Sequence, residues 1–152
     1  MTECLFIVGM GRSGTTIIAE TLNTSLGIPI GEETHFYRLW HKWVRRATPA
    51  EQRGELSADF TFMLEQTGYV VRRDVEVWRS PTGFLISHLR SCSPPDTPIG
   101  EKTPLHLEST MTILGESPDT RVLFIVRDPR DVVRSLESVP WDATSTERRT
   151  TR

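Results

Sequence analysis

The chain has 152 residues, of which 25% are charged and 37% hydrophobic, a composition typical of one soluble globular domain. Its net charge of -2 argues against a general nucleic-acid-binding protein, because such proteins carry a basic excess. The spacing of Cys4 and Cys92 suggests neither a disulfide framework nor a metal site. The sequence shows neither a signal peptide nor an apolar run of the roughly 18 residues that span a bilayer. We therefore expect no nucleic-acid partner, no stable membrane insertion and a cytoplasmic location.

The first predicted unit is a buried strand, a glycine-rich turn and a helix. Residues 5–8 form a short, continuous apolar run, which is typical of a fully buried strand in a parallel sheet. The turn covers residues 9–14. Residues 15–26 then carry isoleucines and leucines at helical spacing, and Gly27 and Pro29 end this helix.

The rest of the chain predicts further helices and one more strand. A second buried strand is expected at residues 122–126, Val-Leu-Phe-Ile-Val. Asp128 serves as the expected N-cap of the last helix, with Pro129 at its first position. We expect a domain of residues 1–141 and a disordered tail at 142–152, because the tail is polar and aperiodic. The predicted helices after the first unit cover residues 36–47, 49–67, 81–90, 103–115 and 130–139.

Three aromatic side chains, Trp40, His41 and Trp43, fall on the predicted helix 36–47. They are candidates for the wall of an acceptor pocket. However, an aromatic stripe at helical spacing more often packs into a core. We therefore assign this cluster to the core.

Residues 9–16, Gly-Met-Gly-Arg-Ser-Gly-Thr-Thr, have the pattern of a phosphate-binding loop. The predicted strand before them and the predicted helix after them are the context that such a loop requires. Glycines let the backbone close around an anion, and the amides of residues 13–16 then meet it at the positive end of the helix. A tight turn with incidental glycines does not explain the Arg-Ser and Thr-Thr pairs that flank Gly14.

The loop differs from the nucleotide-hydrolase form, G-x-x-x-x-G-K-[ST]. Gly9 and Gly14 have the spacing of that form and Thr16 matches its hydroxyl residue, but Thr15 replaces its lysine. That lysine normally reaches the terminal phosphates of a nucleoside triphosphate. A cation lies inside the loop instead, as Arg12. The pattern argues against hydrolysis of ATP or GTP.

The same stretch resembles the 5′-phosphosulfate loop of sulfotransferases, in the Arg-Ser-Gly-Thr-Thr form of tyrosylprotein and many bacterial members. The resemblance implies a P-loop NTPase-like three-layer α/β fold with a central parallel sheet flanked by helices. The family continues beyond the length of this chain, so we expect a C-terminally truncated member with an incomplete sheet. The resemblance also implies that the loop grips the 5′-phosphate and sulfonate of 3′-phosphoadenosine 5′-phosphosulfate (PAPS). The residues concerned are Gly11, Arg12, Ser13, Gly14, Thr15 and Thr16.

A second stretch, residues 121–136, resembles the family's 3′-phosphate motif. The motif has a strand, an arginine at its end and a serine eight residues later on the next helix, and Arg127 and Ser135 fall on those positions. A planar guanidinium donates two parallel hydrogen bonds to a phosphate. Taken alone, Arg127 is better explained as an exposed charge or as a partner of Asp128 or Asp131. Its combination with the first loop, in the family's order, favours the phosphate role.

Residues 31–34, Gly-Glu-Glu-Thr, are similar to a stretch of tyrosylprotein sulfotransferases whose second glutamate is the general base. The similarity implies that role for Glu33. The arginine that follows in the family is His35 here, which leaves the acceptor open and makes His35 a second candidate base. A solvated acidic loop is the alternative interpretation.

Residues 100–104 resemble the stretch that supplies a lysine near the leaving group in many bacterial members, which implies that role for Lys102. A surface lysine is the alternative. Arg12 is the stronger candidate for stabilising the leaving oxygen, because cations placed where charge develops lower the barrier.

Together these motifs predict in-line transfer of a sulfonate group from PAPS to an acceptor hydroxyl, with no metal ion. The acceptor is a carbohydrate, a lipid, a small molecule or a peptide. One alternative is a P-loop small-molecule kinase, which would need magnesium. The other is a catalytically inactive, truncated module that binds the nucleotide and transfers nothing.

Overall fold

The computed structural model describes residues 4–31, 33–46, 49, 64–65, 68–69 and 80–138. Most of the predicted helix 49–67 and all of the predicted tail 142–152 lie outside these residues. No helix within the described ranges is long and apolar enough to cross a membrane. The elements in chain order are β1 (Cys4–Gly9), α1 (Thr15–Leu26), α2 (Phe36–Val44), α4 (Pro81–Ser91), β2 (Ile99–Lys102), the 3-10 helix η2 (Pro104–Ser109), α5 (Thr110–Glu116), β3 (Arg121–Ile125) and α6 (Pro129–Glu137).

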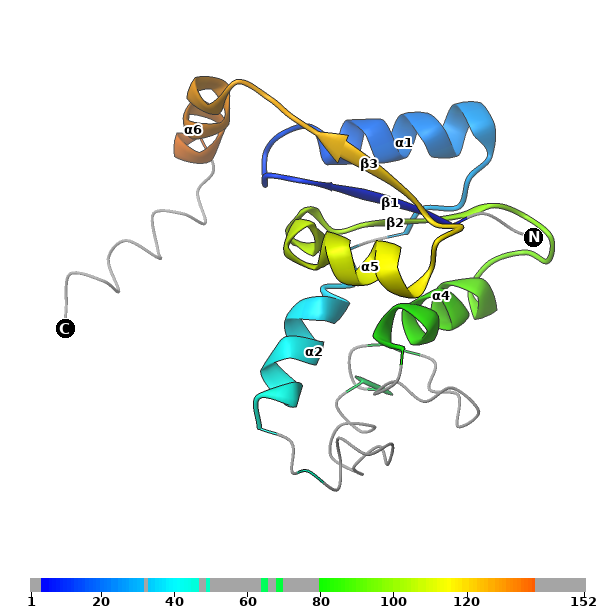
Figure 1. Cartoon of the computed structure of the whole chain (residues 1–152). Helices are drawn as coiled ribbons and strands as arrows, with labels where there is room; N and C mark the ends of the chain where they lie inside the picture. Colours follow the sequence, from blue (N-terminus) through cyan, green and yellow to red (C-terminus); the bar gives the residue numbers. More distant parts are fainter. Residues whose placement is uncertain are drawn as a thin grey trace.

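Three parallel strands form the sheet, in the order β2-β1-β3. Helix α1 lies on one face of this sheet, and α4 and α5 lie on the other (Figure 1). The predicted α/β class, with a parallel sheet flanked by helices, is thereby confirmed. Because the strands are parallel, their carboxyl ends meet at one edge, and the residues that follow each strand are brought together there.

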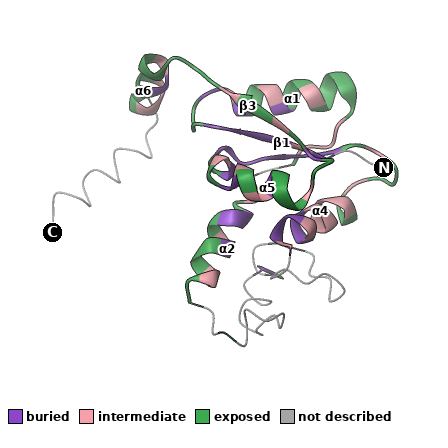
Figure 2. Cartoon of the chain, viewed as in Figure 1, coloured by how far each residue is buried: buried purple, intermediate pink, exposed green. Residues whose placement is uncertain are grey.

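The central strand β1 is buried, as its apolar run predicts. Phe6, Ile7 and Val8 are inaccessible to solvent, and β1 runs through the purple centre of the molecule in Figure 2. Aromatic side chains from α2 and α4 pack in the same core, where the rings of Phe36 and Phe84 stack with centroids 5.5 Å apart. Burial of such side chains stabilises a fold by about 1.5–3 kcal/mol each.

The strand predicted at residues 122–126 forms as β3, but the prediction that it is buried is wrong. Leu123 is 37% exposed and Phe124 is 51% exposed, and Val126, beyond the strand, is 77% exposed. The reason is that β3 pairs only with β1 and is the edge of the described sheet. An apolar run does not distinguish a central strand from an edge strand, since both have the same residue pattern.

Strand β2, Ile-Gly-Glu-Lys, was not predicted, because its four residues include a glycine and two charged side chains. All four are nevertheless buried. Gly100 lies beside Ile30, with which it forms an isolated parallel bridge, and a Cβ on Gly100 would lie 2.5 Å from the Ile30 side chain. Packing against a neighbouring segment therefore determines this strand.

The helix predictions hold with local corrections. The predicted helix 103–115 divides into the 3-10 helix η2 and the α-helix α5. The predicted last helix forms as α6, and its N-cap is confirmed, since the Asp128 carboxylate accepts a hydrogen bond from the backbone N–H of Arg130 at 2.9 Å. The predicted helices 36–47 and 81–90 form as α2 and α4.

The aromatic cluster of α2 divides between the core and the surface. Trp40 is buried and Trp43 packs against the core, as predicted. The assignment of His41 to the core is wrong, because this side chain is exposed and its Nε2 lies 3.0 Å from the Ser109 hydroxyl. Adjacent helical residues point about 100° apart, so His41 leaves the face that Trp40 buries.

Candidate active site

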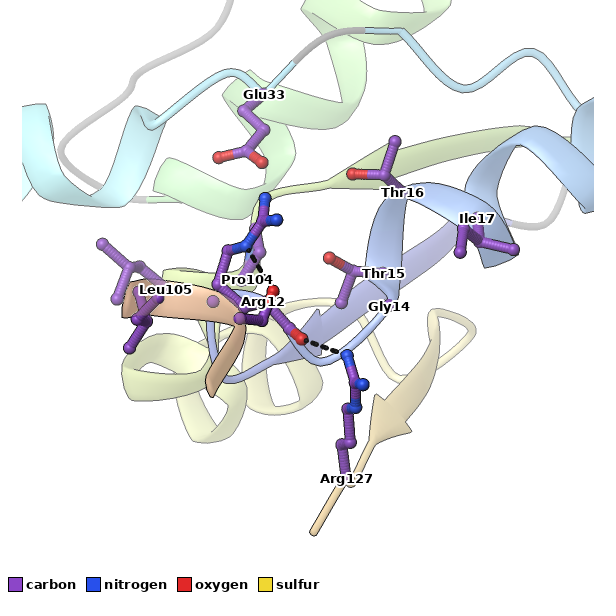
Figure 3. Close-up of a pocket in the computed structure, with 12 residues that line it drawn as sticks. Arg12, Gly14, Thr15, Thr16, Ile17, Glu33, Pro104, Leu105 and Arg127 are labelled. Carbon is purple, nitrogen blue, oxygen red and sulfur yellow. Dashed lines mark hydrogen bonds between the residues drawn. The ribbon is translucent and has the colours of Figure 1, made fainter. Parts of the chain in front are cut away.

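A cavity of about 510 Å³ opens at the carboxyl edge of the sheet (Figure 3). Four segments line it: the loop after β1 with the start of α1, the segment before α2, the start of η2, and the segment from the end of β3 into α6. The lining residues are Gly11, Arg12, Gly14, Thr15, Thr16, Ile17, Glu33, Pro104, Leu105, Arg127, Ser135 and Leu136. Most of the residues that the motifs singled out therefore share one cavity. Ser13 and Lys102 adjoin it, and His35, the second candidate base, does not line it but lies 3.6 Å from Glu33, which does.

The loop after β1 turns sharply because of its glycines and one strained residue. Gly9 pairs with Ile125 in the sheet, and a Cβ on Gly9 would lie 2.5 Å from the Ile125 carbonyl oxygen. Gly14 adopts a left-handed conformation with φ of 100°, and so does Arg12, with φ of 67°. A left-handed non-glycine residue costs about 1–3 kcal/mol, and such strain is characteristic of functional loops.

The start of α1 offers unsatisfied hydrogen-bonding groups to an anion. Its N-cap, Gly14, has no side chain that could accept a hydrogen bond from the amides of the first turn. The Ser13 hydroxyl is buried and has no hydrogen-bond partner among the described residues. Thr15 and Thr16, labelled in Figure 3, follow Gly14 directly and line the cavity. The residues thus fit a bound phosphate or sulfonate group, which would accept their hydrogen bonds at the positive end of the helix.

The two predicted donor motifs touch one another. The guanidinium of Arg127 donates a hydrogen bond to the backbone carbonyl of Arg12 at 3.2 Å, and Nε of Arg12 donates to the Ser135 hydroxyl at 3.0 Å (dashed lines, Figure 3). Arg12 and Arg127 are 115 positions apart in the sequence. The fold therefore brings the two arginines and the Ser135 hydroxyl into the wall of one cavity.

The alternative of an ion pair between Arg127 and a neighbouring aspartate is not realised in the described structure. Asp128 pairs with Arg130 instead, with 2.6 Å between the closest charged atoms. The hydrogen bonds from Arg130 lower the pKa of the Asp128 carboxyl. Arg127 is exposed and forms part of the cavity wall.

Glu33 and Lys102, predicted separately as base and cation, form an ion pair. The Lys102 amine lies 2.9 Å from Oε1 of Glu33, and the His35 ring lies 3.6 Å from Oε2 of the same carboxylate. The Lys102 side chain is only 10% exposed, so it is not a surface lysine, and Glu33 is 33% exposed. Glu33 and Arg12 extend toward the cavity from opposite sides in Figure 3. Lys102 does not line the cavity itself but contacts Glu33, which does.

The buried carboxylate of Glu101 joins several segments of this region through hydrogen bonds. The sequence pattern did not predict this role of Glu101. Glu101 accepts hydrogen bonds from Nδ1 of His106 at 2.9 Å and from the hydroxyls of Thr34 and Thr103. The backbone N–H of Tyr37 donates to the other ring nitrogen of His106, so Nδ1 carries the proton. Burial raises the pKa of Glu101, but the hydrogen bond and electrostatic interaction with His106, together with the threonine hydrogen bonds, outweigh burial and leave it lowered. The network anchors the segments that carry the base and the cation.

The match to known families agrees with this geometry. A family model described as Sulfotransferase family matches residues 4–151. No significant match was found among curated proteins. The matched range includes both arginine-bearing motifs and the Glu33–Lys102 pair.

Proposed function

Because this chain belongs to the sulfotransferase family, we propose that it transfers a sulfonate group from PAPS to a hydroxyl group of an acceptor. The observation that carries the proposal is the contact between the two arginine-bearing motifs across one cavity. PAPS carries an anionic group at each end of its ribose, and the two basic motifs that line the cavity would each bind one of them. Binding of the donor nucleotide is therefore the property that tests this proposal most directly.

In this proposal the loop between β1 and α1 holds the 5′-phosphosulfate. The amides at the start of α1 and the Ser13 hydroxyl, which has no partner among the described residues, donate hydrogen bonds to it. Arg127 and Ser135 hold the 3′-phosphate, since a guanidinium binds a phosphate through two parallel hydrogen bonds. The contacts that now join Arg12, Arg127 and Ser135 would be exchanged for contacts with the donor.

The proposed chemistry places Glu33 as the general base. Its carboxylate accepts the proton of the acceptor hydroxyl while the hydroxyl oxygen bonds to sulfur, and the bond from sulfur to the phosphate oxygen breaks. The products are the sulfated acceptor and 3′-phosphoadenosine 5′-phosphate (PAP), with the proton on Glu33. Negative charge develops on the departing phosphate oxygen, where Arg12 stabilises it. Lys102, which pairs with Glu33, supplies a second positive charge next to the cavity.

Calorimetric titration with PAP tests the donor site, with ATP as the comparison ligand. We expect PAP to bind more tightly than ATP, and Arg127→Ala to weaken PAP binding about 10- to 100-fold through the loss of a charge-assisted hydrogen bond. Arg130→Ala is the matched control, because Arg130 is exposed, pairs with Asp128 and does not line the cavity. Equal affinity for ATP, or no binding of PAP to the unaltered chain, would refute the proposal.

A further inference from the structure

A second cavity, of about 260 Å³, adjoins the proposed donor cavity between α2 and η2. Leu105 lines both cavities. Glu33, in the first, lies 3.6 Å from His35, in the second. Besides His35, its lining includes Arg38, His41 and Arg45 from α2 and its C-terminal turn, and Leu105, Glu108 and Ser109 from η2. A molecule with a hydroxyl at Glu33 would therefore extend past Leu105 into this second space.

The wall formed by α2 is cationic. Arg38, His41 and Arg45 are spaced by three and four residues, so they lie on one face of the helix and its C-terminal turn. Arg38 makes no hydrogen bond or ion pair within the described part of the chain. Nε of Arg45 donates to the backbone carbonyl of His41 at 3.2 Å rather than to a carboxylate. Both guanidinium charges therefore face the cavity without a carboxylate partner among the described residues.

The opposite wall balances only part of this charge. Glu108 is the single carboxylate among the described lining residues, against two arginines. Ser109 contacts Nε2 of His41 at 3.0 Å and so orients the ring at the rim of the cavity. Solvated arginines on a helix usually need no ligand. Here, however, they line a cavity that shares Leu105 with the donor cavity and whose His35 lies 3.6 Å from Glu33, where the proposed function places the acceptor hydroxyl.

From this arrangement we infer that the second cavity binds an anionic group of the acceptor, a carboxylate, sulfate or phosphate, while its hydroxyl lies at Glu33. The inference rests on the proposed function, since it describes the acceptor side of the same site. Arginine forks bind such groups through paired, charge-assisted hydrogen bonds. Leu105 supplies an apolar surface for the part of the acceptor between the hydroxyl and the anionic group. The acceptor is thus a hydroxyl compound that already carries a negative charge.

Histidine imidazole NMR on the PAP-saturated chain tests the inference. The chain has four histidines, of which His35 and His41 line the second cavity on its exposed side and His88 lines neither cavity. The probes are 4-hydroxyphenylacetate and glucuronate, compared with neutral 4-hydroxyphenylacetamide and glucose. We expect an anionic probe to shift His35 and His41, to leave His88 unchanged and to bind about tenfold more tightly than its neutral counterpart.

Two variants with the same net charge show whether the preference for anionic probes arises from the second cavity. Arg38→Gln should remove the preference for the anionic probe, whereas Arg46→Gln should retain it, because Arg46 is an exposed arginine after α2 that does not line the cavity. Equal binding of charged and neutral probes would overturn the inference, as would no shift at His35 and His41 at millimolar probe, or equal effects of the two variants. Calorimetric binding of PAP is measured on the same samples. If PAP fails to bind, the proposed function fails; if PAP binds and the probes show no preference, only the acceptor inference fails.

Discussion

The side-chain amine of Lys102 lies 2.9 Å from the carboxylate of Glu33, although the two residues are 69 positions apart. The pair joins the end of β2 to the segment before α2. It places the proposed general base beside a cation that is itself almost buried. The two motif assignments thus become one arrangement, in which a change at either residue alters the surroundings of the other.

Replacement of Glu33 by glutamine tests its role as base. Glutamine keeps the shape of the side chain but does not accept a proton, so kcat should fall by about 10²- to 10⁴-fold. PAP affinity should change little, because Glu33 is not assigned to the donor. Glu20→Gln, on the exposed side of α1 and outside the cavity, is the control and should retain activity. Steady-state sulfonate transfer measures kcat, and an unchanged kcat in E33Q would rule out Glu33 as base.

Two substitutions of Arg12 separate its charge from its backbone conformation. Both Arg12→Ala and Arg12→Gly remove the guanidinium, so both should lower kcat to a similar degree. Arg12 has φ of 67°, which alanine adopts at a cost and glycine does not. The glycine variant should therefore be more stable than the alanine variant, by about 0.5–1 kcal/mol. Urea denaturation measures the difference, and a more stable alanine variant would contradict the left-handed geometry.

Gly9 is expected to be essential for the contact between β1 and β3. A Cβ at Gly9 would meet the Ile125 carbonyl oxygen at 2.5 Å, so Gly9→Ala should destabilise the fold by about 1–3 kcal/mol through overpacking. Gly115→Ala, in α5, is the control, because a Cβ there would meet no described atom within 4 Å beyond its own turn of helix, and alanine favours a helix. In thermal denaturation, Gly9→Ala should have a lower Tm than the unaltered chain, whereas Gly115→Ala should not. Equal Tm values would refute the close approach.

Acid should destabilise the chain through Glu101. Because hydrogen bonds lower the pKa of folded Glu101, its contribution to stability is complete above the ordinary glutamate pKa of about 4.3 and is lost as pH falls through the folded value. The free energy of unfolding should thus decrease below about pH 4. Glu101→Gln should lower the free energy of unfolding by about 1–3 kcal/mol at neutral pH, and should make that free energy depend less on pH in the acid range. Urea denaturation between neutral and acidic pH measures both effects, and an equally steep acid dependence in E101Q would assign it to other groups.

Chelation separates sulfonate transfer from phosphoryl transfer. The proposed reaction uses Arg12, Arg127 and Lys102 as its cations, so activity should persist in excess EDTA. A small-molecule kinase would lose activity, since its transferred phosphoryl group requires magnesium. Product analysis with labelled PAPS and labelled ATP, with and without EDTA, distinguishes the two. Magnesium-dependent phosphoryl transfer would replace the sulfotransferase proposal.

The local sequence pattern was sufficient to predict those elements whose conformation depends on residues that are neighbours in the chain. The apolar run of β1, the glycines of the following loop and the Asp-Pro start of α6 each specify their own conformation, so the sequence by itself determined these elements and the donor motifs. The strand β2 was not predictable in this way. Its charged residues are buried only because partners from distant segments meet them there.

Tertiary structure alone decided which residues meet. The exposure of Phe124 follows from the position of β3 at the edge of the described sheet, which no run of residues encodes locally. The Glu101–His106 network and the cavity beside Arg38 likewise exist because parallel strands bring their following segments to one edge. Sequence determined the chemistry that each segment carries, and chain topology decided where that chemistry converges, because contacts between distant segments depend on packing rather than on local pattern.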